Sequence, residues 1–318
     1  MQARTCWVLT VGVPGMDNQS IGLAQALGLE VVQKRIHPVA PWKHLPPQLW
    51  LAPLRFLGRG SDAIVPPWPD VVIGTGRLTV AVALAIKRAS GGRTFNIRIQ
   101  DPHTAYDEFD VIVTPQHDRC NRPNVIATLG GLHTLTPARI REAGERFAEK
   151  FADLPQPRVA VLVGGTNKCY RLTPEIGRAL GEQLAALSAT TGVGILLTPS
   201  RRTGAEVEAA LRAALAQTPA YIWDGTGENP YLAYLALADY IVVTADSVNM
   251  VSEACTTGKP VYVVELEGGS RKFRLFHEAM RNGGYTRPFT GKLEHWRYPA
   301  LDDVGRVAEA IRQRLGRR

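Results

Sequence analysis

The sequence predicts an α/β protein made of two domains in tandem, each with a parallel sheet that helices cover on both faces. Three observations lead to this fold class. Short runs rich in Val and Ile alternate with stretches of helical spacing, a pattern typical of strands buried on both sides. The alternation starts again after the segment ADLPQP at residues 152–157. The length of 318 residues is large for a single core, so we expect one domain at 1–153 and a second at 154–318.

The first domain is expected to repeat a strand, a loop and a helix. Its first helix carries Ile21, Leu23, Ala24 and Leu27 at helical spacing and is expected to end at Gly28. The expected strands are the apolar runs Cys6–Val11, Leu29–Ile36, Asp70–Gly74, Thr94–Ile99, Phe109–Thr114 and Asn124–Thr128. Further helices are expected at Leu78–Arg88 and Pro137–Phe151.

The second domain is expected to follow the same order. Its strands are expected at Val159–Gly165, Gly194–Pro199, Tyr221–Trp223, Tyr240–Thr244 and Pro260–Val264. Its helices are expected at Thr173–Ala189, Ala205–Ala216 and Ser247–Thr257. A last helix near Asp302–Leu315 belongs either to this domain or to the first. Two Rossmann-like domains in tandem place a cleft between them that the carboxyl ends of both sheets face.

Composition and charge narrow the classes of partner. The formal charge of +8 favours acidic partners, but the 37 Lys and Arg residues are spread along the chain, which argues against nucleic acid. Four cysteines lie far apart without a CxxC pair, so neither a zinc site nor a disulfide framework is indicated. No apolar run is long enough for a membrane span and no secretory signal opens the chain, so we expect a cytoplasmic protein.

The first loop, GVPGMDNQS, is a candidate acceptor site. Gly12 and Gly15 would let a ligand approach the backbone, and Asn18 and Gln19 would hydrogen-bond it at a helix N-terminus. Asp17 and its neighbours stand where a dinucleotide fingerprint has its third glycine, so that fingerprint is excluded. The alternative is an ordinary tight turn in which Asp17 or Asn18 caps the helix.

Two stretches of the second domain point to diphosphate binding. In VGGTNKCYRLT, a glycine pair follows a strand, and Lys168 and Arg171 add positive charge before a helix. In TADSVNMVSEACTTGKP, Ser247 stands where a strand meets a helix, and Glu253 could accept hydrogen bonds from a ribose diol. The alternatives are a turn with solvated cations, a plain N-cap at Ser247 and a solvated helix charge at Glu253.

The stretch from Pro41 to Gly60 has the composition of a segment that docks on a membrane. Trp42 and Trp50 stand among leucines, with cations nearby such as Arg59, so the range Trp42–Arg59 is a candidate peripheral membrane contact. The alternative is that these aromatics pack under the first domain.

Five motifs in order, GVPGMDNQSIGLAQALG, IQDPH, FDVIVTPQHD, VLVGGTNKCYRLT and TADSVNMVSEACTTGKPVYV, resemble the bacterial family related to the plant mitochondrial fission factor named for elongated mitochondria. The resemblance covers nearly the whole chain. The second half also resembles GT-B glycosyltransferases, above all the lipid-linked muramyl-peptide N-acetylglucosaminyltransferase. This resemblance implies the following contacts: Gly164, Gly165 and Thr166 with the diphosphate, Ser247, Asn249 and Met250 with phosphate and sugar, and Glu253 with the ribose. The first loop lacks that enzyme's paired glycines and histidine.

Glycosyl transfer needs a base for the acceptor hydroxyl and positive charge for the leaving diphosphate. The candidate bases follow strands of the first domain: Asp101 in QDPH, Asp17 in the first loop, and His117 beside Asp118. The alternative roles are turn formation and capping. No Asp-x-Asp dyad of the kind that holds a sugar-nucleotide metal occurs, so we expect no metal and no cofactor beyond the donor.

The expected function is transfer of a sugar from a nucleotide donor, a UDP-sugar, bound by the second domain to an acceptor bound by the first. The basic charge favours an acceptor at the inner membrane face, such as an envelope glycolipid. Two alternatives stay open: a nucleotide-sugar epimerase of the same fold, and a recruitment factor without catalytic activity.

Overall fold

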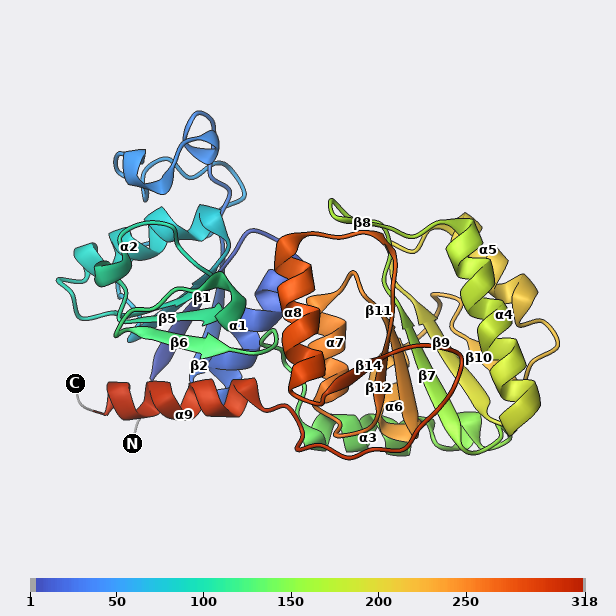
Figure 1. Ribbon diagram of the computed structural model, residues 1–318. Helices are drawn as coiled ribbons and strands as arrows, with labels where there is room; N and C mark the ends of the chain where they lie inside the picture. The colour runs from blue at the N-terminus through green and yellow to red at the C-terminus, as the bar shows by residue number, and fades with distance from the viewer. Residues whose placement is uncertain (1–3, 317–318) are drawn as a thin grey trace. The chain divides into compact units, whose positions relative to one another are not determined.

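The computed structural model describes residues 4–316, which divide into two compact units (Figure 1). The first unit takes Met1–Thr134 and Asp302–Arg318, and the second takes Leu135–Leu301. Each unit has a six-stranded sheet in which every neighbouring pair of strands is parallel. The predicted α/β class with two parallel sheets is therefore confirmed.

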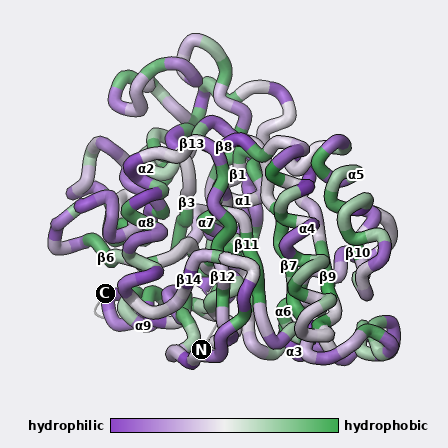
Figure 2. The backbone as a smooth tube through the Cα atoms, turned by 45° about the vertical axis from the view of Figure 1, so that its right-hand side comes forward, coloured by the Kyte–Doolittle hydropathy of each residue, from purple (hydrophilic) through white to green (hydrophobic). Residues whose placement is uncertain are grey.

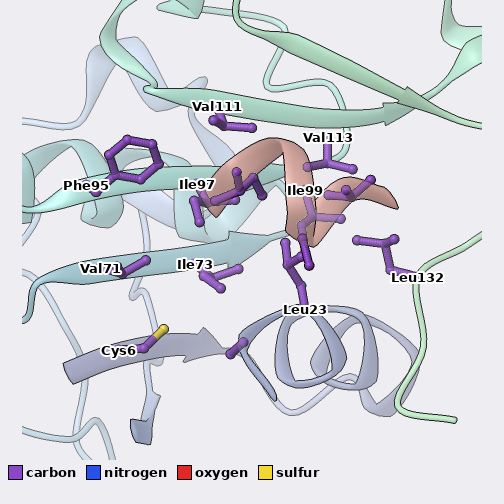
Figure 3. Packing of buried hydrophobic residues seen from close by; sticks show 14 of the residues in the cluster. Cys6, Leu23, Val71, Ile73, Phe95, Ile97, Ile99, Val111, Val113 and Leu132 are labelled. Carbon is purple, nitrogen blue, oxygen red and sulfur yellow. The ribbon is translucent and has the colours of Figure 1, made fainter. Parts of the chain in front are cut away.

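The sheet of the first unit has the order β2-β1-β3-β4-β5-β6. Its strands are β1 (Thr5–Thr10), β2 (Glu30–Arg35), β3 (Val71–Thr75), β4 (Phe95–Ile99), β5 (Val111–Pro115) and β6 (Val125–Thr128). Its α-helices are α1 (Pro14–Ala26), α2 (Val80–Ala89) and α9 (Asp303–Leu315). One face of the sheet forms a core with α1 and α9 that includes Leu23, Ile73 and Ile97 (Figure 3). The other face packs against α2 through alternate residues such as Trp7 and Val72.

The last helix is part of the first unit. Asp303, 6% exposed, accepts hydrogen bonds from the backbone N–H groups of Leu129 and Gly130 at 2.9 and 2.7 Å. Val307 and Ile311 of the same helix are fully buried in the core that contains α1. These contacts attach α9 to the end of β6.

The division between the units falls at Leu135, earlier than the boundary at 153 and 154 that the sequence suggested. The reason is α3 (Pro137–Phe147), which packs on α6 (Tyr231–Leu237) of the second unit. A Cβ atom at Gly144 of α3 would lie 2.7 Å from the Cβ atom of Ala236 on α6, so the two helices are in close contact there.

The sheet of the second unit has the order β10-β9-β7-β11-β12-β14. Its strands are β7 (Arg158–Val163), β9 (Gly194–Pro199), β10 (Ala220–Ile222), β11 (Tyr240–Thr244), β12 (Val261–Val264) and β14 (Thr286–Pro288). Besides α3 and α6, its α-helices are α4 (Pro174–Thr191), α5 (Ala205–Ala214), α7 (Val248–Cys255) and α8 (Arg271–Asn282). Two short antiparallel strands, β8 (Tyr170–Arg171) and β13 (Glu267–Gly268), pair outside the sheet. Figure 2 shows hydrophobic residues along β7 and β11 at the centre of this sheet.

The aromatic segment that follows β2 is only partly exposed. Trp50 is 7% exposed and belongs to the core that contains α2, so the expected membrane contact through Trp50 is wrong. Trp42 is half-buried and packs on the ring of Phe56, with ring centroids 5.0 Å apart. The guanidinium of Arg77 donates to the carbonyl of Leu45 at 2.8 Å and holds the segment against the start of α2. Among residues 4–316, no helix is both long and apolar enough to cross a bilayer.

Candidate functional site

The carboxyl ends of β7, β9 and β11 meet around the side chain of Asp246, which has no exposed surface. Its carboxylate accepts hydrogen bonds from the N–H of Gly165 at 3.0 Å and from the hydroxyl of Thr244 at 2.7 Å. The guanidinium of Arg202, from the loop after β9, forms an ion pair with it at 2.8 Å. A buried carboxylate is tolerated only with such partners, so Asp246 ties three loops together.

The glycine pair after β7 is required by the protein's own packing. A Cβ atom at Gly164 would lie 2.1 Å from a carboxylate oxygen of Asp246, and one at Gly165 would lie 2.0 Å from the carbonyl oxygen of Arg202. The N–H of Gly164 donates to the hydroxyl of Thr244 at 2.7 Å, and the N–H of Gly165 donates to Asp246. Both amides are therefore already engaged inside the protein.

The rest of this loop is a hydrogen-bonded turn that exposes two cations. The side-chain oxygen of Asn167 accepts from the N–H groups of Cys169 and Tyr170 at 2.7 and 2.9 Å. The hydroxyl of Thr166 accepts from the N–H of Leu172 at 3.1 Å. Two exposed side chains of the loop have no ion pair in the described part of the chain: Lys168 and Arg171. The loop thus offers two cations just before α4.

Two side-chain hydrogen bonds stabilise the corner between β11 and α7, one made by Ser247 and one made by His277. Ser247 is the N-cap of α7 and accepts from the N–H of Met250 at 3.3 Å, so the predicted capping role is present. The Nε2 atom of His277, on α8, lies 2.8 Å from the carbonyl oxygen of Ala245, which can only accept a hydrogen bond. Burial lowers the pKa of His277, so the neutral ring donates its Nε2–H to that carbonyl. Asn249 and Met250 follow in the first turn of α7.

Glu253 is a partly buried carboxylate and not a solvated helix charge. The hydroxyl of Tyr231, the first residue of α6, donates to its Oε2 atom at 2.5 Å. Burial raises the pKa of Glu253 to about 7, and the hydrogen bond from Tyr231 opposes this rise. No hydrogen bond from residues 4–316 reaches the other oxygen, Oε1, so this carboxylate can accept hydrogen bonds from a ligand.

In the first unit, α1 begins earlier than the sequence suggested. It starts at Pro14 with Val13 as N-cap, so neither Asp17 nor Asn18 caps it. Proline is well suited to the first helical turn because its missing N–H would have no partner there. Asp17, Asn18 and Gln19 therefore lie in the helix.

Two of the predicted acceptor-site glycines differ in their surroundings. Gly12 has φ +79° with open space around it, which favours glycine, whereas Gly15 lies inside α1. The hydroxyl of Thr10 accepts from the N–H of Gly12 at 2.9 Å and donates to Asp17 at 2.5 Å. Asn18 is exposed. Asp17 therefore stabilises the corner between β1 and α1.

The other two candidate bases follow β4 and β5, which are neighbours in the sheet. One oxygen of Asp101 accepts from the hydroxyl of Tyr106 and from the N–H of His103, both at 2.7 Å. The ring of His117 is 4% exposed and lies 3.8 Å from the carboxylate of Asp118.

Asp101 and Asp118 follow neighbouring strands, β4 and β5. Burial and then the charge of Asp101 raise the pKa of the Cys120 thiol, Arg122 opposes this rise, and Asp118 adds to it. Asp17 follows β1, and β3 lies between β1 and β4. The structure therefore brings Asp101 and His117 to adjacent strand ends but does not group Asp17 with them.

Sequence reasoning missed three residues with buried polar contacts: Asp246, Tyr231 and Arg98. Arg98 is 2% exposed and donates to the carbonyl of Gly76 and the hydroxyl of Thr79, both at 2.9 Å. Burial lowers its pKa to about 9, and the charge of Asp101 opposes this fall. The position of Asp246, two residues after a strand, could have indicated its role, but nothing in the sequence around Tyr231 or Arg98 predicts their contacts. Within the described residues, no three His, Cys, Asp or Glu side chains are grouped as metal ligands.

Comparisons with known proteins identify a family and a fold. A family model described as Mitochondrial fission ELM1 matches residues 14–315, which confirms the resemblance that the motifs predicted. The mitochondrial fission protein ELM1 of Arabidopsis thaliana is 30% identical over 393 residues, covering 99% of this chain and 92% of the relative.

Two solved structures are similar over almost the whole chain. One is the UDP-GlcNAc 2-epimerase of Methanocaldococcus jannaschii, in complex with UDP-GlcNAc and UDP, with a TM-score of 0.56 and 12% identity, covering 99% of both chains. The other is a glycosyltransferase from Rickettsia africae, with a TM-score of 0.51 and 11% identity, covering 99% of this chain and 89% of that one. This likeness is one of fold, and it confirms the predicted GT-B architecture.

We expect the substitution Tyr231→Phe to raise the pKa of Glu253 further, by about one pH unit, because the ionised carboxylate loses a hydrogen bond. Carbon-13 NMR of the glutamate side-chain carboxyl groups across pH 5–9 measures this midpoint. Tyr240→Phe, which leaves the Glu253 contact intact, is the matched control. An unchanged Glu253 midpoint in Tyr231→Phe would contradict the assigned contact.

Proposed function

The chain belongs to the mitochondrial fission ELM1 family, and from that premise we propose that it binds a nucleotide sugar and transfers the sugar to an acceptor. The donor binds the second unit. The observation that carries this proposal is the partly buried Glu253, with one oxygen held by Tyr231 and the other directed to no protein donor among the described residues. A fixed carboxylate of this kind suits a ribose diol, and it lies on the helix that follows the Asp246 corner.

The donor's diphosphate is proposed to meet the exposed cations Lys168 and Arg171 and the first turn of α7, where Ser247, Asn249 and Met250 lie. Thr166 stands beside these groups in the loop after β7. Gly164 and Gly165 take part by allowing the loop to pack on Asp246, since their amides already donate within the protein. A UDP-sugar is the proposed donor because the epimerase of the same fold is described with UDP-GlcNAc and UDP bound.

The acceptor is proposed to bind the first unit at the start of α1, near Gly12, Gly15, Asn18 and Gln19. Asp101 is the preferred base because its Oδ1 atom takes both hydrogen bonds, which leaves Oδ2 to accept the proton of the acceptor hydroxyl. Asp17 is engaged by Thr10, and His117 is buried, so both are weaker candidates.

Two alternative functions are each supported by one specific observation. The fold shared with an epimerase favours conversion of a free nucleotide sugar without an acceptor. The relationship to a mitochondrial fission protein favours recruitment of partners at a membrane without catalysis. An epimerase would convert a UDP-sugar in the absence of any acceptor. A recruitment factor would need no nucleotide binding at all.

A peripheral membrane contact is also proposed, through the range Trp42–Arg59 of a cytoplasmic protein at the inner membrane face. Leu49 and Leu51 are 56% and 71% exposed, so they replace Trp50 as the apolar side chains of this contact. Lys43, Arg55 and Arg59 are exposed in the same segment and would attract anionic lipid.

We expect calorimetry to detect binding of UDP and UDP-GlcNAc, and we expect Glu253→Ala to weaken it by about 10- to 100-fold, the cost of losing hydrogen bonds to a charged group. Affinity should be higher at pH 8 than at pH 6, because Glu253 is ionised above its pKa of about 7 and protonated below it. Glu182→Ala, an exposed glutamate of α4, should leave both affinity and pH dependence unchanged. A folded protein that gives no heat with either ligand would contradict nucleotide binding and favour the recruitment function.

We expect the protein to sediment with anionic vesicles at low salt, and the double substitution Leu49→Asp with Leu51→Asp to weaken this by about tenfold or more, because exposed apolar surface is lost and negative charge is added. Added salt should also weaken it, since the cations act through a screened field. Val32→Asp changes a side chain that is 40% exposed on β2 and serves as the control. Equal sedimentation of the double variant and the control would contradict a contact through this segment.

A further inference from the structure

A cavity of the second unit lies away from the proposed nucleotide site. It is a groove of about 490 Å³ along α3 and α6, with Lys259 in its wall. Lys259 precedes β12, so the groove is at the amino ends of the strands, whereas Asp246 follows the carboxyl end of β11. The volume is within the range of roughly 300–1,000 Å³ that small-molecule sites occupy.

The walls of the groove are mostly hydrocarbon. Ile140 and Ala148 lie on the α3 side, and Leu237 belongs to α6. The helices touch at Gly144, where a Cβ atom would lie 2.7 Å from that of Ala236, and this contact forms part of the groove. A sugar or nucleotide bound here would have hydroxyl groups against these apolar walls. Those hydroxyl groups would lose their hydrogen bonds with water, so binding of such a ligand would be unfavourable.

Lys259 is a cation without an anion in the described part of the chain. Its ammonium donates to the carbonyl oxygens of Leu235 and Ala236 at 2.7 and 2.6 Å, which caps the end of α6 and uses two of its three N–H groups. Across residues 4–316, no carboxylate lies within ion-pair distance of this ammonium. Asp239 affects Lys259 only by longer-range electrostatic attraction. Burial lowers the pKa of Lys259 to about 8, and the charge of Asp239 opposes this fall.

We propose that this groove binds a fatty-acid anion, with the acyl chain along α3 and α6 and the carboxylate on the remaining N–H of Lys259. Arg141 and Glu145 line the exposed edge of the groove and pair with each other at 3.9 Å, so the positive charge offered to the ligand comes from Lys259. A hydrocarbon chain with a single anionic end matches both the apolar walls and the buried cation. This ligand is separate from the nucleotide sugar, and the inference does not rest on the proposed transfer reaction.

The test is calorimetry of the full chain with octanoate and decanoate below their micelle concentrations. Affinity should rise about fourfold for each added methylene, because each one removes more hydrocarbon from water. Decanol, which has the chain but no charge, should bind at least about tenfold more weakly than decanoate, since a hydrogen bond to a charged group is worth more than a neutral one.

Two variants separate a specific groove from unspecific binding. Ile140→Glu places a carboxylate in the groove and should abolish decanoate binding, whereas Ala138→Glu, on the same helix but outside the groove, should not. Lys259→Met should reduce decanoate affinity to that of decanol. Because Lys259 also caps α6, the melting curve of the Lys259→Met variant must be recorded. If Lys259→Met unfolds, the Ile140→Glu variant still tests the proposal.

Three results would each overturn the inference: no decanoate binding, equal binding of decanol and decanoate, or unchanged binding in Ile140→Glu. Saturating UDP should leave decanoate affinity unchanged, because the two sites lie at opposite ends of the strands. Failure of nucleotide binding therefore has no bearing on this groove.

Discussion

The carboxylate of Asp246 is the contact on which the arrangement of the proposed nucleotide site depends. It has no exposed surface, and it joins the glycine pair after β7, the hydroxyl at the end of β11 and the guanidinium of Arg202. Because a Cβ atom at Gly164 would stand 2.1 Å from this carboxylate, the protein's own packing restricts the sequence of the loop even without a ligand. A buried charge held this way is strongly destabilising if one partner is removed.

The same arrangement of side chains occurs at one corner of each six-stranded sheet. In the first unit, the hydroxyl of Thr10 accepts from the N–H of Gly12 and donates to Asp17. In the second, the hydroxyl of Thr244 accepts from the N–H of Gly164 and donates to Asp246. In both units a threonine at a strand end thus links a glycine loop to a carboxylate. Only the second loop carries the exposed cations Lys168 and Arg171, which is why we propose that the diphosphate binds there.

Much of the fold could be predicted from the sequence, because continuous Val and Ile runs such as DVVIG and YIVVT are strands buried on both faces. The start of α1 could not, since Asp17 and Asn18 resemble caps although Pro14 already opens the helix. Glu253 could be proposed as a ligand from its place on the helix after a strand, and the family resemblance implies the same role. Its partner Tyr231 is 22 residues away, and nothing in the local sequence predicts their contact. The burial of Trp50 could not be predicted because a tryptophan among prolines and cations suits a membrane surface and a core equally well.

The central claim is that the second unit holds the diphosphate and ribose of a nucleotide around the Asp246 corner. Hydrogen–deuterium exchange of the full chain, with and without saturating UDP, tests this claim most directly, because it reports on each segment separately. The account predicts slower exchange in residues 164–173 and 245–253, with no change in residues 12–20. Slower exchange confined to residues 12–20, or none in the two segments of the second unit, would contradict it.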